Sequence, residues 1–334
     1  MRRFSGAAGS VHRVTVHSAA LEGNLLGDPS NRLVDVYVPA GHSSSHLPLL
    51  VDLVGFTGSG LSHTNWAAFQ ENVPERLDRL IGEGNMPPVV VAFPDCFTRL
   101  GGNQYINSPV MGPWEDYLLA EMLPAIERRF GCGGQGHRGV FGKSSGGYGS
   151  IVHALRHADV WTAAACHSGD MAFELCYLPD MPLVLQGLAK TDNSIERWWT
   201  ELEAARKHPA EASTVFNILA MAASYDPDPS QFLGIRLPVT LDTCELIPER
   251  WNNWLRHDPL VMLETHADSL RGMKALYIDC GATDQFRLLY GARRMARRLA
   301  QLGISHRYEE FPDNHSGVDY RMDESLPYLA QALT

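Results

Sequence analysis

The sequence lacks an apolar run long enough to cross a bilayer, and no apolar block of the signal-peptide kind follows the basic start at Arg2 and Arg3. It also lacks an excess of positive charge, because 28 Lys and Arg stand against 38 Asp and Glu, a formal net charge of −10. Such a balance disfavours attraction to nucleic acid or to an anionic membrane. We therefore expect a cytoplasmic protein that has neither of these as a partner.

Cysteine is sparse as well. The six cysteines are scattered without C-x-x-C spacing, and Cys166 and Cys280 fall inside apolar, strand-like runs. Cysteines in such runs are usually packed thiols. The sequence therefore predicts no disulfide framework and no structural zinc or other metal site.

The chain has 334 residues, of which 45% are hydrophobic and 20% charged, enough for one large α/β domain or two smaller ones. Strand-like runs occur at Val11–His17, Leu33–Val38, Pro48–Val54, Pro88–Phe93, Gly139–Phe141, Thr162–Cys166, Lys274–Cys280 and His306–Phe311. Helical spacing of apolar residues occurs at Trp66–Ile81, Trp114–Phe130, Gly146–His157, Gln285–Leu302 and in the last stretch to Leu333. This alternation predicts a mostly parallel sheet with helices on both faces, in a single domain over residues 1–334.

Residues 169–266 interrupt the alternation. The segment has helical stretches such as Ser194–Lys207 but no convincing βα repeat, and it holds four of the seven tryptophans: Trp198, Trp199, Trp251 and Trp254. It lies between the sixth and seventh strands, so it leaves the sheet at the carboxyl edge, where α/β folds bind ligands. We predict a helical cap whose tryptophans line a substrate pocket. The alternative is that they fill the core of the cap itself.

The most informative motif is Gly142-Lys143-Ser144-Ser145-Gly146, which follows a short apolar run and opens a helical pattern. This G-x-S-x-G pattern is typical of a nucleophile elbow, in which Ser144 sits at a sharp strand-to-helix turn. A phosphate-binding P-loop is the nearest alternative. It requires glycine where this chain has His137, and Gly136 misses by one position.

A serine nucleophile needs a base, and the base needs an acid to orient it. In α/β-hydrolases the acid and then the histidine follow the serine, in loops after late strands. Asp284 and His315 are in such loops, and His315 is the only one of 14 histidines that combines this loop position with the correct order. Asp279, within the preceding strand, and an acid of the cap are alternatives to Asp284, whereas Asp313 is too close to His315 in sequence.

The negative oxygen of an acyl-transfer intermediate needs two N–H donors. The Ser145 amide is one candidate, because it follows the nucleophile at the start of a helix. The Phe56 amide, in the glycine-rich loop after the third strand, is the other. The alternative for Phe56 is an ordinary glycine-rich turn.

These motifs together resemble the putative-esterase family of α/β-hydrolases, which includes esterase D (S-formylglutathione hydrolase), enterochelin esterases, feruloyl esterase domains and the antigen 85 mycolyltransferases. The resemblance covers roughly residues 30–167 and 270–332. It rests on Gly142–Gly149, Gly55-Phe56-Thr57, Gly101–Ser108, Trp114–Tyr117 and Cys280–Asp284. It implies an α/β-hydrolase fold with an eight-stranded sheet, no cofactor, a triad of Ser144, Asp284 and His315, and oxyanion amides at Phe56 and Ser145.

The sequence thus predicts a carboxylesterase that cleaves a small-molecule ester through an acyl-serine intermediate. An acyltransferase and a thioesterase of the S-formylglutathione hydrolase type are alternatives within enzymes, since they share the first half-reaction. A catalytically silent binding protein of the same fold is the alternative outside enzymes. The cap departs from the compact esterase D pattern, and the sequence leaves the substrate and the oligomeric state open, a homo-oligomer included.

Overall fold

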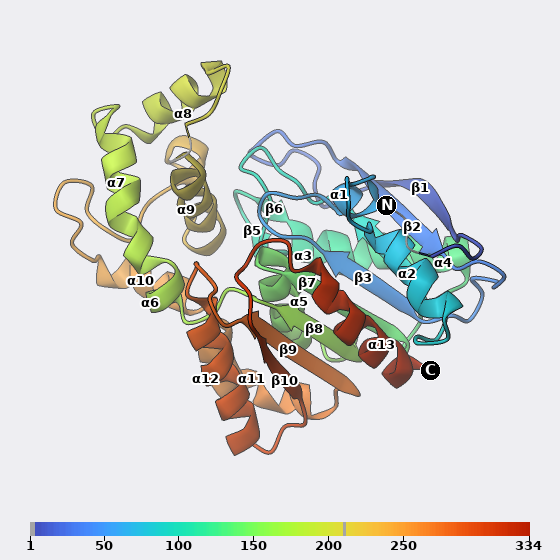
Figure 1. Cartoon of the computed structure of the whole chain (residues 1–334). Coiled ribbons are helices and arrows are strands. Elements are labelled where there is room, and N and C mark those ends of the chain that lie inside the picture. Colours follow the sequence, from blue (N-terminus) through green and yellow to red (C-terminus); the bar gives the residue numbers. More distant parts are fainter. Residues whose placement is uncertain (1–3, 210–211) are drawn as a thin grey trace.

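The computed structural model describes residues 4–209 and 212–334. Its centre is a sheet of eight strands in the order β1-β2-β4-β3-β7-β8-β9-β10 (Figure 1). The strands are β1 (Ser10–His17), β2 (Asn31–Val38), β3 (Leu49–Leu53), β4 (Val90–Pro94), β7 (Arg138–Lys143), β8 (Ala163–His167), β9 (Ala275–Gly281) and β10 (Arg307–Phe311). β2 pairs antiparallel with β1 and β4, and the other pairs are parallel. All eight predicted strands are confirmed.

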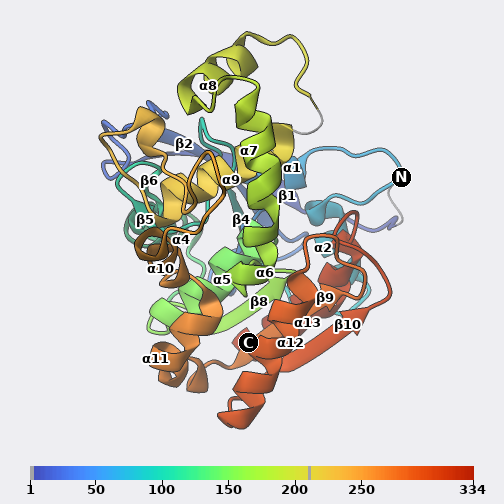
Figure 2. The ribbon, with the colours of Figure 1, turned by 90° about the vertical axis from the view of Figure 1, so that its left-hand side faces the viewer.

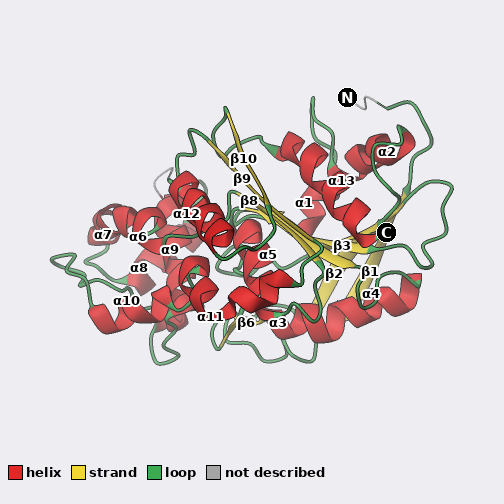
Figure 3. Ribbon diagram, turned by 90° about the horizontal axis from the view of Figure 1, so that it is seen from below, coloured by secondary structure: helices red, strands yellow, loops and turns green. Residues whose placement is uncertain are grey.

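Helices cover both faces of the sheet, as Figure 3 shows. One face carries α2 (Val73–Gly82) and α13 (Met322–Leu333), whose apolar side chains form one core cluster with the sheet. The other carries α4 (Leu123–Phe130), α5 (Ser145–Arg156), α11 (Pro259–Arg271) and α12 (Leu288–Gln301), which pack in a second, larger cluster. Every residue of β3, β4, β8 and β9 is buried for this reason, which explains why these strands have continuous apolar runs. The predicted architecture of a mostly parallel eight-stranded sheet with helices on both faces is confirmed.

Two helices differ from their predicted bounds. α2 begins at Val73, because Asn72 and Glu75 form a capping box there, and only the short helix α1 (Gly60–Thr64) precedes it. The predicted helix 114–130 is α3 (Trp114–Asp116), then a π-helical segment (Tyr117–Met122), then α4. The change falls just before Pro124, which has no amide hydrogen with which to continue the ladder. The two-residue strands β5 (Asn107–Ser108) and β6 (Gly112–Pro113) pair outside the main sheet and were not predicted.

Between β8 and β9 the described chain forms helices and contributes no strand to the sheet. Figures 1 and 2 show α6 (Phe173–Cys176), α7 (Met181–Ala189), α8 (Ile195–Ala204), α9 (Ala212–Tyr225) and α10 (Pro248–Leu255) gathered at one side of the sheet. The next helix, α11, packs against α5 on the sheet face. The part of the chain that leaves the sheet, here called the helical insertion, therefore spans α6 to α10 and ends before Pro259. No described helix is long and apolar enough to cross a membrane.

Candidate active site

Ser144 sits at a strained turn between β7 and α5. Its backbone has φ 59° and ψ −123°, a conformation that residues with a Cβ rarely adopt. Hydrogen bonds hold the turn, since the Ser144 amide donates to the His167 carbonyl (3.0 Å) and the Tyr148 amide donates to the Ser144 carbonyl (2.8 Å). The turn has the geometry of a nucleophile elbow.

Glycine is required on both sides of Ser144 because strand β3 packs directly against the turn. A Cβ atom on Gly142 would lie 2.1 Å from the Leu53 carbonyl oxygen, and one on Gly146 would lie 1.7 Å from it. Neither approach leaves room for a side chain. Residues 138–143 form strand β7, so no loop before Gly142 could surround a phosphate, and the P-loop alternative is wrong.

Asp284 and His315 meet beyond the ends of β9 and β10. The distance between Asp284 Oδ2 and His315 Nδ1 is 2.8 Å, and both side chains are buried. The Phe286 amide donates to Asp284 Oδ1 (2.9 Å), and the His315 amide donates to the Gln285 side chain (3.0 Å). The phenyl ring of Phe286 also packs edge-on against the imidazole. The carboxylate therefore fixes the orientation of the imidazole and leaves Nε2 as its other polar atom.

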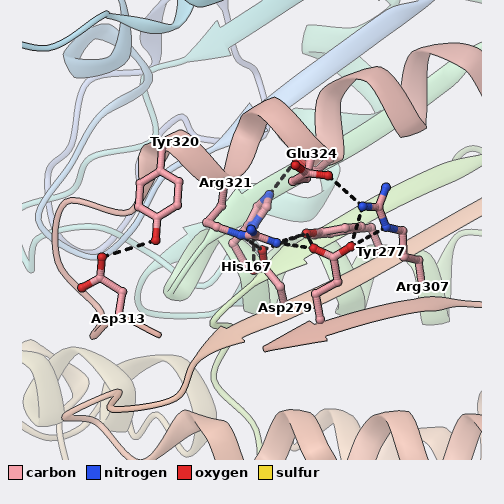
Figure 4. A network of polar contacts seen from close by, with 10 residues as sticks. His167, Tyr277, Asp279, Arg307, Asp313, Tyr320, Arg321 and Glu324 are labelled. Atoms are coloured by element: carbon pink, nitrogen blue, oxygen red, sulfur yellow. Dashed lines mark hydrogen bonds and ion pairs between the residues drawn. The ribbon is translucent and has the colours of Figure 1, made fainter. Parts of the chain in front are cut away.

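Asp279 belongs to a different network (Figure 4). It is completely buried and contacts His167 Nδ1 (2.8 Å) and Arg321 Nε (3.0 Å). Burial tends to raise the pKa of Asp279, but the contacts with His167 and Arg321 outweigh it and lower the pKa. Asp313 accepts hydrogen bonds from the Asn314 amide and from the Tyr320 hydroxyl, and none joins it to His315. Asp284 is therefore the carboxylate beside His315, and the alternative of Asp279 is wrong.

Phe56 and Ser145 are the two residues whose backbone amides we predicted as oxyanion donors. Phe56, Ser144 and Ser145 line one cleft, and the loop before Phe56 approaches so closely that a Cβ on Gly55 would lie 3.4 Å from Ser144 Cβ. The Phe56 carbonyl accepts from the Gly102 amide (2.6 Å), which anchors the loop. Within residues 4–209 and 212–334 neither the Phe56 nor the Ser145 amide donates a hydrogen bond, so both are free for a ligand oxygen.

The cleft has a volume of about 430 Å³ and brings Ser144 and His315 together. Its walls come from the loop after β3, from the loops after β7 to β10 and from the helical insertion. Many lining side chains are polar, among them Thr57, Lys143, Asp170, Asp180, Ser213, Thr214, Asn217 and Gln285. The cleft is thus more polar than the aromatic pocket that we expected from the sequence.

The four tryptophans of the insertion do not line this cleft, and that expectation is corrected. Each is at most 9% exposed: Trp198, Trp199, Trp251 and Trp254. Trp199 stacks on Phe216 of α9 at 5.3 Å, whereas Trp198 lines a separate cavity of about 260 Å³. They lie on the buried faces of α8 and α10, where they form part of the apolar core of the insertion.

A cluster of aromatic side chains joins the insertion to α5, the helix that begins directly after Ser144. Trp254 contacts the rings of Tyr177 and Tyr225, and Tyr225 contacts Tyr148 of α5 at 5.8 Å between ring centroids. Phe173 lies against the three tyrosines. We name these five residues, Tyr148, Phe173, Tyr177, Tyr225 and Trp254, the aromatic cluster. It fixes the base of the insertion to α5.

Trimming Trp254 to alanine should lower the free energy of unfolding by about 3–5 kcal/mol, because it leaves a large cavity in the aromatic cluster. The relative kcat/KM for short and long esters should stay unchanged. Denaturant unfolding and an ester-length series check both points. Trp66→Ala, at a side chain that is 79% exposed, is the control and should change stability by no more than about 0.5 kcal/mol. An altered ester preference in Trp254→Ala would restore the pocket interpretation.

Sequence reasoning missed Asp170 and Gln104. Asp170 follows β8 and lines the cleft, and Gln104 Nε2 contacts both Asp170 Oδ2 and Ser145 Oγ at 3.3 Å. Gln104 lies within the stretch Gly101–Ser108 that carries the family resemblance, but nothing in the sequence gave it or Asp170 a role, because an aspartate after a strand and a glutamine in a loop usually lie at the surface. Among the described residues no group of three or more His, Cys, Asp or Glu side chains could hold a metal ion.

Comparison with curated proteins finds limited matches. Esterase MT1326 and Esterase Rv1288 from two strains of Mycobacterium tuberculosis are each 33% identical over 89 residues. The matched segment is 25% of this chain and 18% of each relative. The match therefore relates a quarter of this chain to less than a fifth of the length of each esterase.

Solved structures match almost the whole chain. A ferulic acid esterase has a TM-score of 0.63 at 17% identity, over 98% of this chain and 100% of its own. An S-formylglutathione hydrolase from Agrobacterium tumefaciens has a TM-score of 0.59 at 16% identity, over 99% and 98%. At these identities the likeness shows the α/β-hydrolase fold alone.

The family comparison covers most of the sequence. A model of the family described as "Putative esterase" matches residues 29–323, and this range contains the elbow, Asp284 and His315. The match supports an enzyme that hydrolyses esters. By sequence and by fold, the chain belongs to the Putative esterase family.

Proposed function

We propose that this protein is a carboxylic-ester hydrolase that works through an acyl-serine intermediate on Ser144. One observation carries the proposal: the strained elbow serine shares a cleft with His315, whose Nδ1 is held by Asp284 at 2.8 Å. A serine, a histidine and a carboxylate in this relation form the parts of a hydrolytic triad.

In the first half-reaction, Ser144 Oγ attacks the ester carbonyl carbon while His315 Nε2 takes the hydroxyl proton. The tetrahedral intermediate collapses, the bond to the alcohol oxygen breaks, and His315 returns the proton to the leaving alcohol. In the second half, water attacks the acyl-serine, gives its proton to His315, and the free acid and Ser144 are regenerated. Asp284 offsets the positive charge of the imidazolium at each proton transfer.

The negative oxygen of each tetrahedral intermediate would accept hydrogen bonds from the Phe56 and Ser145 amides. Neither amide has a hydrogen-bond partner among the described residues, so both can donate to a ligand oxygen. The Ser145 amide also lies at the positive end of the α5 helix dipole. A donor of this kind contributes about 2.7–4 kcal/mol to lowering the barrier. The two amides together are needed for appreciable turnover.

Acyl transfer and thioester hydrolysis would use the same first half-reaction. They differ only in the group that resolves the acyl-serine or in the atom that leaves. Product analysis separates hydrolysis from acyl transfer, since hydrolysis yields a free acid even when alcohols are present. Comparing an ester with the thioester of the same acid separates an esterase from a thioesterase. A silent binding protein would have no need of a strained serine that shares a cleft with an oriented histidine.

A fluorophosphonate probe tests the proposal directly. The wild-type protein should label at Ser144, identified by mass analysis of the modified peptide, because the probe requires an activated serine. Ser145→Ala is the matched control and should label like the wild type, whereas Ser144→Ala should not. Absence of wild-type labelling, or labelling at another serine, would contradict the proposed nucleophile.

A further inference from the structure

Asp170 is a carboxylate on the wall of the cleft that the proposed chemistry does not use. It lies in the loop between β8 and α6, and its side chain is buried with 8% of its surface exposed. It lines the same cleft as Ser144 and His315. A buried carboxylate beside a reaction site needs a physical explanation.

Among the described residues, only one of its two carboxylate oxygens has a hydrogen-bond partner. Oδ2 accepts hydrogen bonds from the Tyr177 hydroxyl (3.0 Å) and from Gln104 Nε2 (3.3 Å). Oδ1 accepts no hydrogen bond from the described residues. It is nevertheless not fully buried, so solvent or a ligand can reach it. Oδ1 is therefore the oxygen that remains accessible from the cleft.

No lysine or arginine forms an ion pair with this carboxylate in the described part of the chain, and the only cation that lowers its pKa is the more distant His315 imidazolium. Asp180, another acid of the cleft, differs because Arg287 contacts it at 2.6 Å. Burial raises the pKa of Asp170 despite the bonds from Tyr177 and Gln104. A donor from a ligand would offset part of the cost of burying the carboxylate.

We propose that Asp170 Oδ1 binds a hydrogen-bond donor of the substrate, a hydroxyl or an ammonium group, and so selects esters that carry such a group. The inference rests on the proposed function, since the ligand is the ester cleaved at Ser144. Asp170 is then a specificity residue. It takes no part in proton transfer.

The test compares six esters by pH-stat titration of the released acid. The acyl series is ethyl butyrate, ethyl 3-hydroxybutyrate and ethyl 3-aminobutyrate. The alcohol series is propyl butyrate, 2-hydroxyethyl butyrate and 2-dimethylaminoethyl butyrate.

The readout is the ratio of kcat/KM between a donor ester and its donor-free parent. The wild type should favour at least one donor ester by about 10-fold or more, as for a hydrogen bond to a charged group. The preferred ester distinguishes hydroxyl from ammonium.

Asp170→Asn should lower this ratio by about 10-fold or more. Because Tyr177 and Gln104 both donate to the Oδ2 position, the amide oxygen should occupy it, which turns an NH2 group toward the cleft in place of an acceptor. Asp180→Asn, in the same cleft, is the control and should keep the wild-type ratio.

The outcomes are separable. Hydrolysis without any donor preference in the wild type overturns the inference alone, and this result does not depend on whether a variant folds. A ratio that survives in a folded Asp170→Asn also overturns it. If the wild type cleaves none of the six esters, the proposed function fails and the inference fails with it.

Discussion

Replacing Ser144 with alanine should lower kcat for ester hydrolysis by about a million-fold, the scale seen when a triad serine is removed from a hydrolase. The variant loses the hydroxyl oxygen that we propose attacks the carbonyl. The fold should survive, because Ser144 is half-buried and alanine has the same Cβ in the same positive-φ conformation. Steady-state kinetics with p-nitrophenyl butyrate and a thermal melt check both expectations.

Ser145→Ala is the matched control, one residue further along. The Ser145 side chain accepts a weak hydrogen bond from Gln104 at 3.3 Å, whereas its proposed catalytic group is the backbone amide, which alanine keeps. Ser145→Ala should therefore retain kcat within about 10-fold, since a neutral hydrogen bond contributes about 0.5–1.5 kcal/mol. If the two variants exchanged these phenotypes, Ser145 would be the nucleophile.

Asp284→Asn should lower kcat by about 10,000-fold with little effect on folding. An asparagine NH2 facing Nδ1 would favour the imidazole tautomer whose proton is on Nε2, and Nε2 could then no longer accept the proton of Ser144. The pair is close enough for this effect, at 2.8 Å between Nδ1 and the carboxylate. Steady-state kinetics on the purified variant measure the loss.

Asp279→Asn is the informative comparison for Asp284→Asn. Asp279 is buried between His167 and Arg321, and loss of its charge leaves the guanidinium of Arg321 without that partner. Breaking a buried ion pair costs about 3–5 kcal/mol, so this variant should lose stability, and its folded fraction should keep far more activity than Asp284→Asn. A steeper loss of kcat in folded Asp279→Asn than in Asp284→Asn would reassign the acid.

The strands were predictable because each is a local signal. β3, β4, β8 and β9 are buried on both faces, and burial on both faces produces a continuous apolar run that can be read from the sequence. The start of α2 was not predicted, because Trp66 and Phe69 are apolar yet exposed. The π-helical segment depends on how the chain passes Pro124, which hydrophobic periodicity does not encode.

The candidate site likewise has residues that the sequence predicts and residues that only the fold brings together. Ser144, Asp284 and His315 were predicted from a motif, the chain order and strand ends, all of which are properties of the sequence. The environment of Asp170 depends on Gln104 and Tyr177, one of them 66 residues away along the chain, and only the fold brings them together. The tryptophans were misplaced because an aromatic residue on a helix has the same pattern whether it faces a ligand or a core.

The aromatic cluster has a consequence for how substrates reach Ser144. Tyr148 belongs to α5, and its hydroxyl also donates to the His257 carbonyl (3.0 Å), so the insertion is bonded to the helix that begins beside Ser144. If the insertion moved away from α5, the buried side chains of Trp254, Tyr225 and Phe173 would become exposed to water, which costs free energy. These contacts hold the base of the insertion as a wall of the cleft. We therefore expect that substrate entry and product release do not require this base to open like a hinged lid.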